Sequence, residues 1–244
     1  MVWADDRDRL TLRARFLEPD PADPRRERPR PMPLDEMLRQ LDQVKDKLGL
    51  DYATALTALF RPRDARPGAA HAAVMALDAL AVLTSNYDLL LEAADPARQR
   101  YTHRQATTAL SDLRDGRPVL FKVHGSAEDH ESVVLTLDEY RAAHADTKYQ
   151  AVMRNLLADR SFLFVGYGMS DPHDLDVLLA ESVTDLRGSI PLHFALLPRL
   201  ADEQAEVDRR AKLRREHRVV VIPYDDRDGH REATDLLRAL AAAP

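Results

Sequence analysis

Short apolar runs and amphipathic stretches alternate along most of the chain. The apolar runs, four to six residues long and rich in Val, Leu and Phe, are typical of strands buried in a parallel sheet. They predict strands over residues 79–84, 119–123, 162–165, 192–197 and 219–222. Elsewhere apolar residues recur with helical spacing. This spacing predicts helices over residues 34–48, 52–60, 69–77, 88–94, 104–114, 137–145, 149–158, 173–186, 201–216 and 232–242.

The order of these elements predicts the fold class. Strands that alternate with helices are joined by right-handed crossovers, which place helices over both faces of a parallel sheet. We therefore expect an α/β fold with a Rossmann-like parallel sheet that is covered on both faces.

The first 33 residues differ from the rest of the chain. Leu10, Leu12, Ala14 and Phe16 alternate with polar residues, which fits a half-buried strand. Residues 19–33 hold six prolines and many charges, a composition typical of an extended surface loop. We expect an N-terminal extension over residues 1–33 and one α/β domain over residues 34–244.

Composition narrows the functional classes. The 244 residues include 35 basic and 41 acidic side chains, and a net charge of −6 argues against a general nucleic-acid binder. The chain has no cysteine, which excludes disulfides and thiolate zinc sites, and its histidines lack metal-binding spacing, so no metal is expected. No apolar stretch approaches the roughly 20 residues that span a bilayer. With no signal-peptide core at the N-terminus, we expect a cytoplasmic protein without a membrane partner.

Polar residues follow three of the predicted strands. Asn86 follows the first, His124 the second, and the turn Gly166-Tyr-Gly-Met-Ser-Asp171 the third. Ligands of open α/β sheets bind outside the carboxyl ends of the strands. We therefore expect the three strand ends to converge on one crevice that suits a nucleotide.

Each strand end also has a purely structural interpretation. Ser85, Asn86 and Asp88 are residue types that cap helix N-termini, whereas an Asn amide could instead hold a sugar hydroxyl or a water. A lone histidine is usually a surface or core residue. His124, however, precedes Gly125, which allows close backbone approach, and an imidazole can act as a general base near neutral pH.

The third strand end is equally open to two interpretations. A glycine-bearing turn before a helix can be a tight turn with a capping Ser or Asp, or a cradle for phosphate. Tyr224 ends the last predicted strand, where it could contact a nucleotide base.

Taken in order, these segments resemble the sirtuin-like family, specifically its bacterial NAD-consuming branch, which is often found in anti-phage defence. Thr84-Ser85-Asn86-Tyr87-Asp88 resembles the family's Thr-x-Asn-x-Asp motif. Lys122-Val-His124-Gly125-Ser126 resembles its catalytic His-Gly segment, and Gly166-Tyr-Gly168-Met-Ser170-Asp171 its Gly-Tyr-x-x-x-Asp turn. The resemblance runs from about His71 to the C-terminus.

Two departures from the family pattern matter. Residues 127–160 contain none of the cysteines that form the zinc module of the deacylases, so a zinc-dependent deacylase is disfavoured. In addition, no glycine precedes Gly49, although the family begins with a strand and a Gly-Ala-Gly loop that holds pyrophosphate. The first glycine-loop unit is therefore missing or altered. A truncated or wrongly started reading frame, loss of half the nucleotide site, and a different N-terminal arrangement would each explain this.

The resemblance implies an NAD+ hydrolase that cleaves the nicotinamide–ribose bond, with NAD+ as substrate and Asn86 and His124 as catalytic residues. It assigns nucleotide contacts to Thr84, Ser85, Asp88, Gly125, Ser126, Gly166, Gly168, Ser170 and Asp171. Tyr224 is added as a predicted contact because it ends the last strand. It also implies control by homo-oligomerisation or by a protein partner. The competing hypothesis is an impaired sensor or scaffold domain that binds NAD or an ADP-ribose-like nucleotide; protein deacylation is a third and would require a peptide groove.

Overall fold

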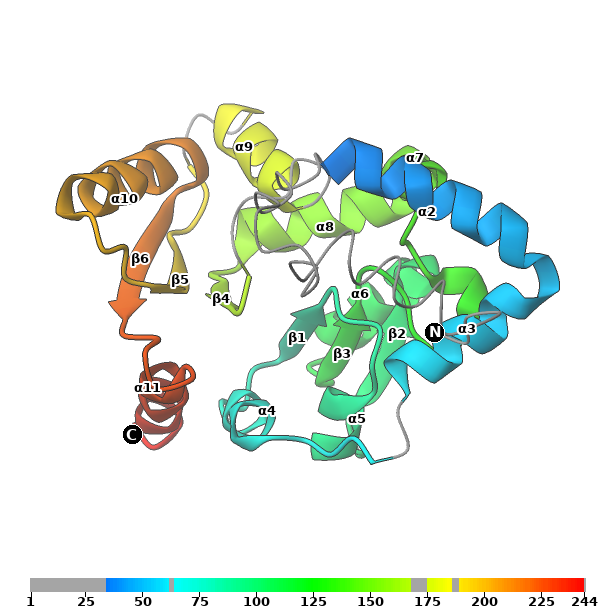
Figure 1. Ribbon diagram of the computed structural model, residues 1–244. Helices are drawn as coiled ribbons and strands as arrows, with labels where there is room; N and C mark the ends of the chain where they lie inside the picture. Colours follow the sequence, from blue (N-terminus) through cyan, green and yellow to red (C-terminus); the bar gives the residue numbers. More distant parts are fainter. Residues whose placement is uncertain (1–33, 62–63, 168–174, 186–188, 244) are drawn as a thin grey trace, which may run out of the picture.

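The computed structural model describes residues 34–61, 64–167, 175–185 and 189–243 (Figure 1). The strand expected around residues 10–16, together with Gly168, Ser170 and Asp171, lies outside these ranges. The proposed division of the chain at residue 34 stays a prediction.

Within the described residues, six strands form two parallel sheets of three strands each. In the first sheet, β3 (Val119–Lys122) lies between β1 (Ala81–Thr84) and β2 (Gln99–Thr102). In the second, β5 (His193–Pro198) lies between β4 (Leu163–Val165) and β6 (Val219–Tyr224). All four strand pairs are parallel, as the alternation of strands and helices predicts.

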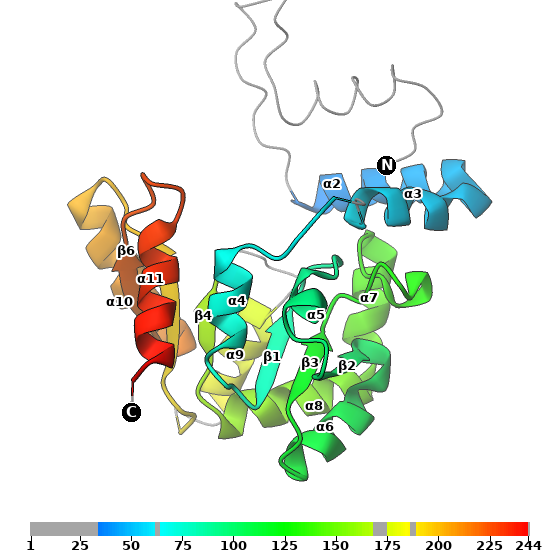
Figure 2. The ribbon, with the colours of Figure 1, turned by 90° about the horizontal axis from the view of Figure 1, so that it is seen from below.

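Helices flank both sheets, so the expected α/β architecture is confirmed (Figures 1 and 2). They are α2 (Leu34–Leu48), α3 (Tyr52–Phe60), α4 (Ala69–Met75), α5 (Leu90–Ala94), α6 (Ala106–Arg114), α7 (Leu137–Ala145), α8 (Thr147–Asp159), α9 (Leu175–Asp185), α10 (Glu203–His217) and α11 (Arg231–Ala241). The N-termini of α8 and α10 illustrate why local sequence predicts where helices begin. The Asp146 carboxylate accepts hydrogen bonds from the first turn of α8, and the Asp202 carboxylate does the same for α10.

One strand escaped prediction. Residues Gln99–Thr102 form β2 although this stretch is largely polar and contains no apolar run. The strand lies at the outer edge of its sheet and pairs only with β3, so one of its sides faces outward. An edge strand needs little apolar character of its own, because β3 supplies the hydrogen-bonding partner.

The main core lies against β3 and β5. Val119 and Phe121 of β3 pack in one buried cluster with Met153 and Leu157 of α8, and Ala195 of β5 joins the same cluster. Every residue of β3 is buried, as expected for the middle strand of a covered parallel sheet. This packing fixes the carboxyl end of β3, which carries His124.

The described strands form two separate sheets, whereas the sequence analysis expected one parallel sheet. Strands β1 and β4 are edge strands of their respective sheets, and no pairing joins them in the described ranges. A cavity of about 700 Å³ lies between them, lined by both strands and by residues of α4, α6 and α8. The edge strands β1 and β4 therefore form two walls of this cavity, which we call the large cavity.

Candidate functional site

The loop after β1 is ordered by its own polar side chains. The Asn86 backbone N–H donates to the Thr84 hydroxyl at 3.1 Å, and the Asp88 carboxylate accepts from the Leu90 N–H at 2.9 Å. Asp88 therefore binds the first residue of α5, although Leu89 and not Asp88 occupies the N-cap position. The Asn86 side chain is exposed, and with Thr84 and Ser85 it lines the large cavity.

Tyr87 fastens this loop to the segment that follows β3. Its hydroxyl donates to the carbonyl of Val134 at 2.7 Å, and its own carbonyl accepts from the N–H of Ala127 at 2.9 Å. Its ring lies 4.7 Å, centroid to centroid, from the ring of Phe60. The motif contains this residue, but sequence reasoning gave it no role.

His124 is buried, with 7 % of its surface exposed. Its ring meets the ring of Tyr140 edge-on at 5.1 Å, and its carbonyl accepts from the N–H of Val134 at 2.9 Å. A small cavity of about 20 Å³ lies beside it and is also lined by Tyr140 and His144. That volume is enough for about one water molecule.

Gly125 and Ser126 shape the turn that follows His124. Gly125 has a φ of +86°, and a Cβ at this position would lie 2.0 Å from the carbonyl oxygen of Ser132. The Ser126 N–H donates to the Ser132 hydroxyl at 3.0 Å, and the Ser126 side chain is buried. The structure thus accounts for both residues through the turn itself, and their contact with a nucleotide stays a prediction.

Two further predicted contacts that fall within the described ranges, Gly166 and Tyr224, belong to the second sheet. Gly166 follows β4 with a φ of +66° and, like Tyr167, lines the large cavity opposite Asn86. Tyr224 lies elsewhere: its side chain is buried against α11, and its hydroxyl lies 2.9 Å from Nδ1 of His230. Tyr224 does not contribute to the lining of the large cavity.

The structure therefore brings together part of the predicted site. Thr84, Ser85, Asn86 and Gly166 share the large cavity, whereas His124 lines the small one. Val123 contributes to both linings. His124 thus faces a different cavity from Asn86, although the strands that precede the two residues are paired.

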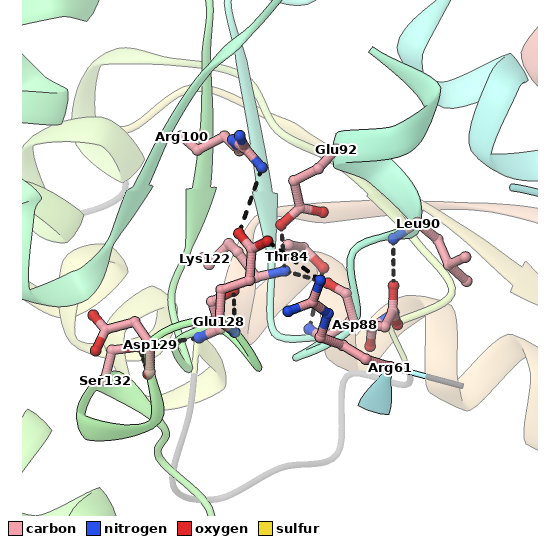
Figure 3. Close-up of polar contacts among 12 residues, drawn as sticks. Arg61, Thr84, Asp88, Leu90, Glu92, Arg100, Lys122, Glu128, Asp129 and Ser132 are labelled. Atoms are coloured by element: carbon pink, nitrogen blue, oxygen red, sulfur yellow. Dashed lines mark hydrogen bonds and ion pairs between the residues drawn. The ribbon is translucent and has the colours of Figure 1, made fainter. Parts of the chain in front are cut away.

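Sequence reasoning missed a buried ion pair beneath the Asn86 loop (Figure 3). Lys122, the last residue of β3, is 2 % exposed, and its Nζ lies 2.7 Å from Oε1 of Glu92 on α5. The same Nζ donates to the backbone carbonyl of Asp88. The available signal was one lysine inside the apolar run Val-Leu-Phe-Lys-Val.

A second, more exposed group of charges lies nearby in Figure 3. The Glu128 carboxylate lies 3.8 Å from Arg61 and 3.6 Å from Arg100, and all three side chains are about half exposed. Such surface pairs contribute little to stability. In the described ranges, no three His, Cys, Asp or Glu side chains form a group that could hold a metal ion, and no helix is long and apolar enough to cross a bilayer.

Comparison with known proteins shows which family the chain resembles. The SIR2-like domain profile matches residues 80–222, more than half of the chain. Over 126 residues the chain is 27 % identical to the NAD(+) hydrolase ThsA of Enterococcus faecium. This aligned segment covers 49 % of this chain and 26 % of that protein. Over 143 residues it is 30 % identical to the NAD(+) hydrolase ThsA of Bacillus cereus (strain MSX-D12), which covers 54 % of this chain and 29 % of that protein.

A third relative is the Defense-associated sirtuin 2 of Bacillus subtilis, 30 % identical over 117 residues, which covers 45 % of this chain and 11 % of that protein. The matched segments thus span less than a third of each of these relatives. The family profile covers both the Asn86 and the His124 segments. The chain belongs to the SIR2-like domain family.

Proposed function

We propose that this chain carries the catalytic site of an NAD+ hydrolase that cleaves the bond between nicotinamide and ribose. The observation that carries the proposal is the register of two neighbouring strands. Thr84 of β1 pairs with Lys122 of β3, so Asn86 and His124 each lie two residues beyond the same rung of a parallel ladder. Neighbouring strands are about 4.8 Å apart, and these two polar residues therefore leave the sheet side by side.

The cavity between the sheets supports this proposal. Its volume of about 700 Å³ falls within the roughly 300–1,000 Å³ typical of small-molecule sites. Thr84, Ser85 and Asn86 line it from one sheet and Gly166 from the other. We assign the nucleotide to the carboxyl-terminal mouth of this cavity, as in other open α/β folds. Gly168, Ser170 and Asp171 stay predicted contacts of its ribose and phosphate groups.

The chemistry requires few groups. Nicotinamide leaves as a neutral molecule from a cationic precursor, so the leaving group needs no general acid. The developing oxocarbenium-like ribose must be held and then captured by water. In the proposed mechanism His124 accepts a proton from that water or from a ribose hydroxyl, and Asn86 positions the same group through an amide that both donates and accepts.

The test is cleavage of NAD+ by the purified full chain, followed as release of free nicotinamide. We expect turnover in the natural chain, and a loss of about 10²- to 10⁴-fold in His124→Ala and in Asn86→Ala. His217→Ala, on α10, is the matched control and should retain full turnover. Intact NAD+ in every sample, or unchanged turnover in His124→Ala, would refute the assignment.

A second candidate is a nucleotide sensor or scaffold without turnover. The burial of His124, and its absence from the lining of the large cavity, favour this alternative. Calorimetric titration with ADP-ribose separates the two functions: tight binding without any NAD+ cleavage identifies a sensor. We further propose a role in defence controlled by self-association or by a protein partner, because the relatives include a defence-associated sirtuin.

A further inference from the structure

The buried pair of Lys122 and Glu92 lies directly beneath the loop that carries Asn86. Lys122 ends β3 two residues before His124, and Glu92 lies on the first turns of α5, the helix that follows the Asn86 loop. Both side chains are almost fully enclosed, with 3 % and 4 % of their side-chain surfaces exposed. The pair therefore connects the two segments on which the proposed reaction depends.

Stability alone is a poor explanation for this pair. Removing two charges from water costs several kcal/mol each, and well-packed apolar residues at the same positions are often as stabilising or more so. Here the geometry is also incomplete, because in the described ranges Oε2 of Glu92 has no hydrogen-bond partner. A buried ion pair with an unsatisfied oxygen needs a reason other than the stability of the core.

The contacts of Lys122 indicate that reason. Besides Glu92, its ammonium group donates to the carbonyl of Asp88, two residues after Asn86. Backbone hydrogen bonds hold the same loop on either side of Asn86: the N–H of Val123 donates to the carbonyl of Thr84 at 3.0 Å, and the N–H of Ala127 to that of Tyr87 at 2.9 Å. Lys122 supplies the only side-chain cation in the described ranges that is hydrogen-bonded to the backbone of this loop.

We propose that Lys122 is a positioning residue that holds the Asn86 loop in register with His124, and that Glu92 keeps its ammonium group aimed at the carbonyl of Asp88. The functional part of this inference rests on the proposed NAD+ cleavage. The structural part does not, because the order of the loop can be measured without any substrate.

The decisive variant removes both charges at once. Lys122→Met alone leaves the Glu92 carboxylate buried without its cation, so it could fail to fold for that reason. The double variant Lys122→Met/Glu92→Leu leaves no uncompensated charge and keeps both positions filled. It removes the bond to Asp88 while sparing the core, which separates positioning from structural support.

The chain offers a matched control on α10. Arg209 also donates both to a buried carboxylate, that of Glu206, and to a backbone carbonyl, that of Pro198. This second pair lies in the other half of the molecule, away from Asn86 and His124. Arg209→Met/Glu206→Leu therefore removes a similar pair where no proposed catalytic loop is held, and it also removes the carboxylate that accepts from Arg210 and from the N–H of Leu200.

Two readouts decide the question. We expect hydrogen–deuterium exchange of amides 86–92 to become at least about tenfold faster in the Lys122→Met/Glu92→Leu chain and to stay unchanged in the control. If the chain cleaves NAD+, we expect kcat to fall by about 10- to 100-fold while KM changes little, since misplacement by 1 Å can cost that much.

The two proposals can fail separately. Exchange of residues 86–92 as slow as in the natural chain would overturn the positioning role, whether or not NAD+ is cleaved. Unchanged kcat in an active double variant would overturn it as well. Faster exchange confined to this loop, in a chain that never cleaves NAD+, would support the tether and refute only the hydrolase.

Discussion

The two sheets of this protein share one construction, but their central strands carry buried polar side chains at opposite ends. In the first sheet, Lys122 and His124 are buried at and beyond the carboxyl end of β3. In the second, the fully buried polar residue is His193, at the amino end of β5, with its ring edge-on to those of Phe162 and Phe164. Ligands of parallel sheets bind at the carboxyl ends, so the same residue type suggests chemistry in one sheet and core structure in the other.

Substitution of Gly125, which follows β3 in the first sheet, should give the largest stability effect. Gly125→Ala must accommodate a Cβ 2.0 Å from the carbonyl oxygen of Ser132 in addition to a φ of +86°. We expect a loss of at least about 3 kcal/mol in the free energy of unfolding, measured by denaturant titration. A loss below about 1 kcal/mol would show that the turn after His124 relaxes easily.

The next largest effect concerns pH and the second sheet. Burial, together with the positive charge of Arg218, lowers the pKa of His193 to about 4. Because the unfolded chain binds this proton first, near pH 6.5, the stability contributed by the neutral ring is complete above that pH and is lost as the pH falls toward 4. We expect a loss of at most about 3 kcal/mol across this interval.

His193→Asn tests that assignment. Nδ1 of His193 accepts from the N–H of Phe162 at 3.2 Å, and an Asn oxygen can take that role without titrating. Denaturant titrations at pH 7, 5.5 and 4 should show a shallower decline for the variant than for the natural chain. Equal declines would assign the pH dependence to other groups. If the chain cleaves NAD+, the same variant should do so at neutral pH as fast as the natural chain.

The glycine of the second sheet should give a smaller effect. Gly166 has a φ of +66°, but a Cβ there would meet no atom within 4 Å. Gly166→Ala should therefore cost only the left-handed backbone conformation, about 1–2 kcal/mol. Thermal unfolding measured beside Gly125→Ala gives the difference directly; a larger loss for Gly166→Ala would reverse the comparison.

The smallest effect on stability is expected from the hydrogen bond that joins the loop after β1 to the segment after β3. Tyr87→Phe removes one hydrogen bond, from the hydroxyl to the carbonyl of Val134 at 2.7 Å, and keeps the ring contact with Phe60. We expect about 1 kcal/mol of destabilisation. Tyr101→Phe is a comparison on β2, because its hydroxyl also makes one hydrogen bond, to Asp112.

Much of the fold could be predicted from the sequence, because apolar periodicity and capping are local. The helix predicted over residues 34–48 has the same bounds in the structure, and the predicted strand over residues 119–123 ends one residue earlier. β2 could not be predicted in this way, since its residues are polar and its strand conformation depends on pairing with β3. The candidate site was predicted by residue type, but the burial of His124 and the partners of Lys122 were not.

The sequence by itself determined the alternation of strands and helices and the polar residues at the strand ends, because these depend on side chains close together in the chain. Only the tertiary structure decided that the strands form two sheets with a cavity between β1 and β4. It also decided that Asn86 lines this cavity whereas His124 lines the small one. Pairing, burial and cavities arise between residues far apart in sequence, and no local pattern encodes them.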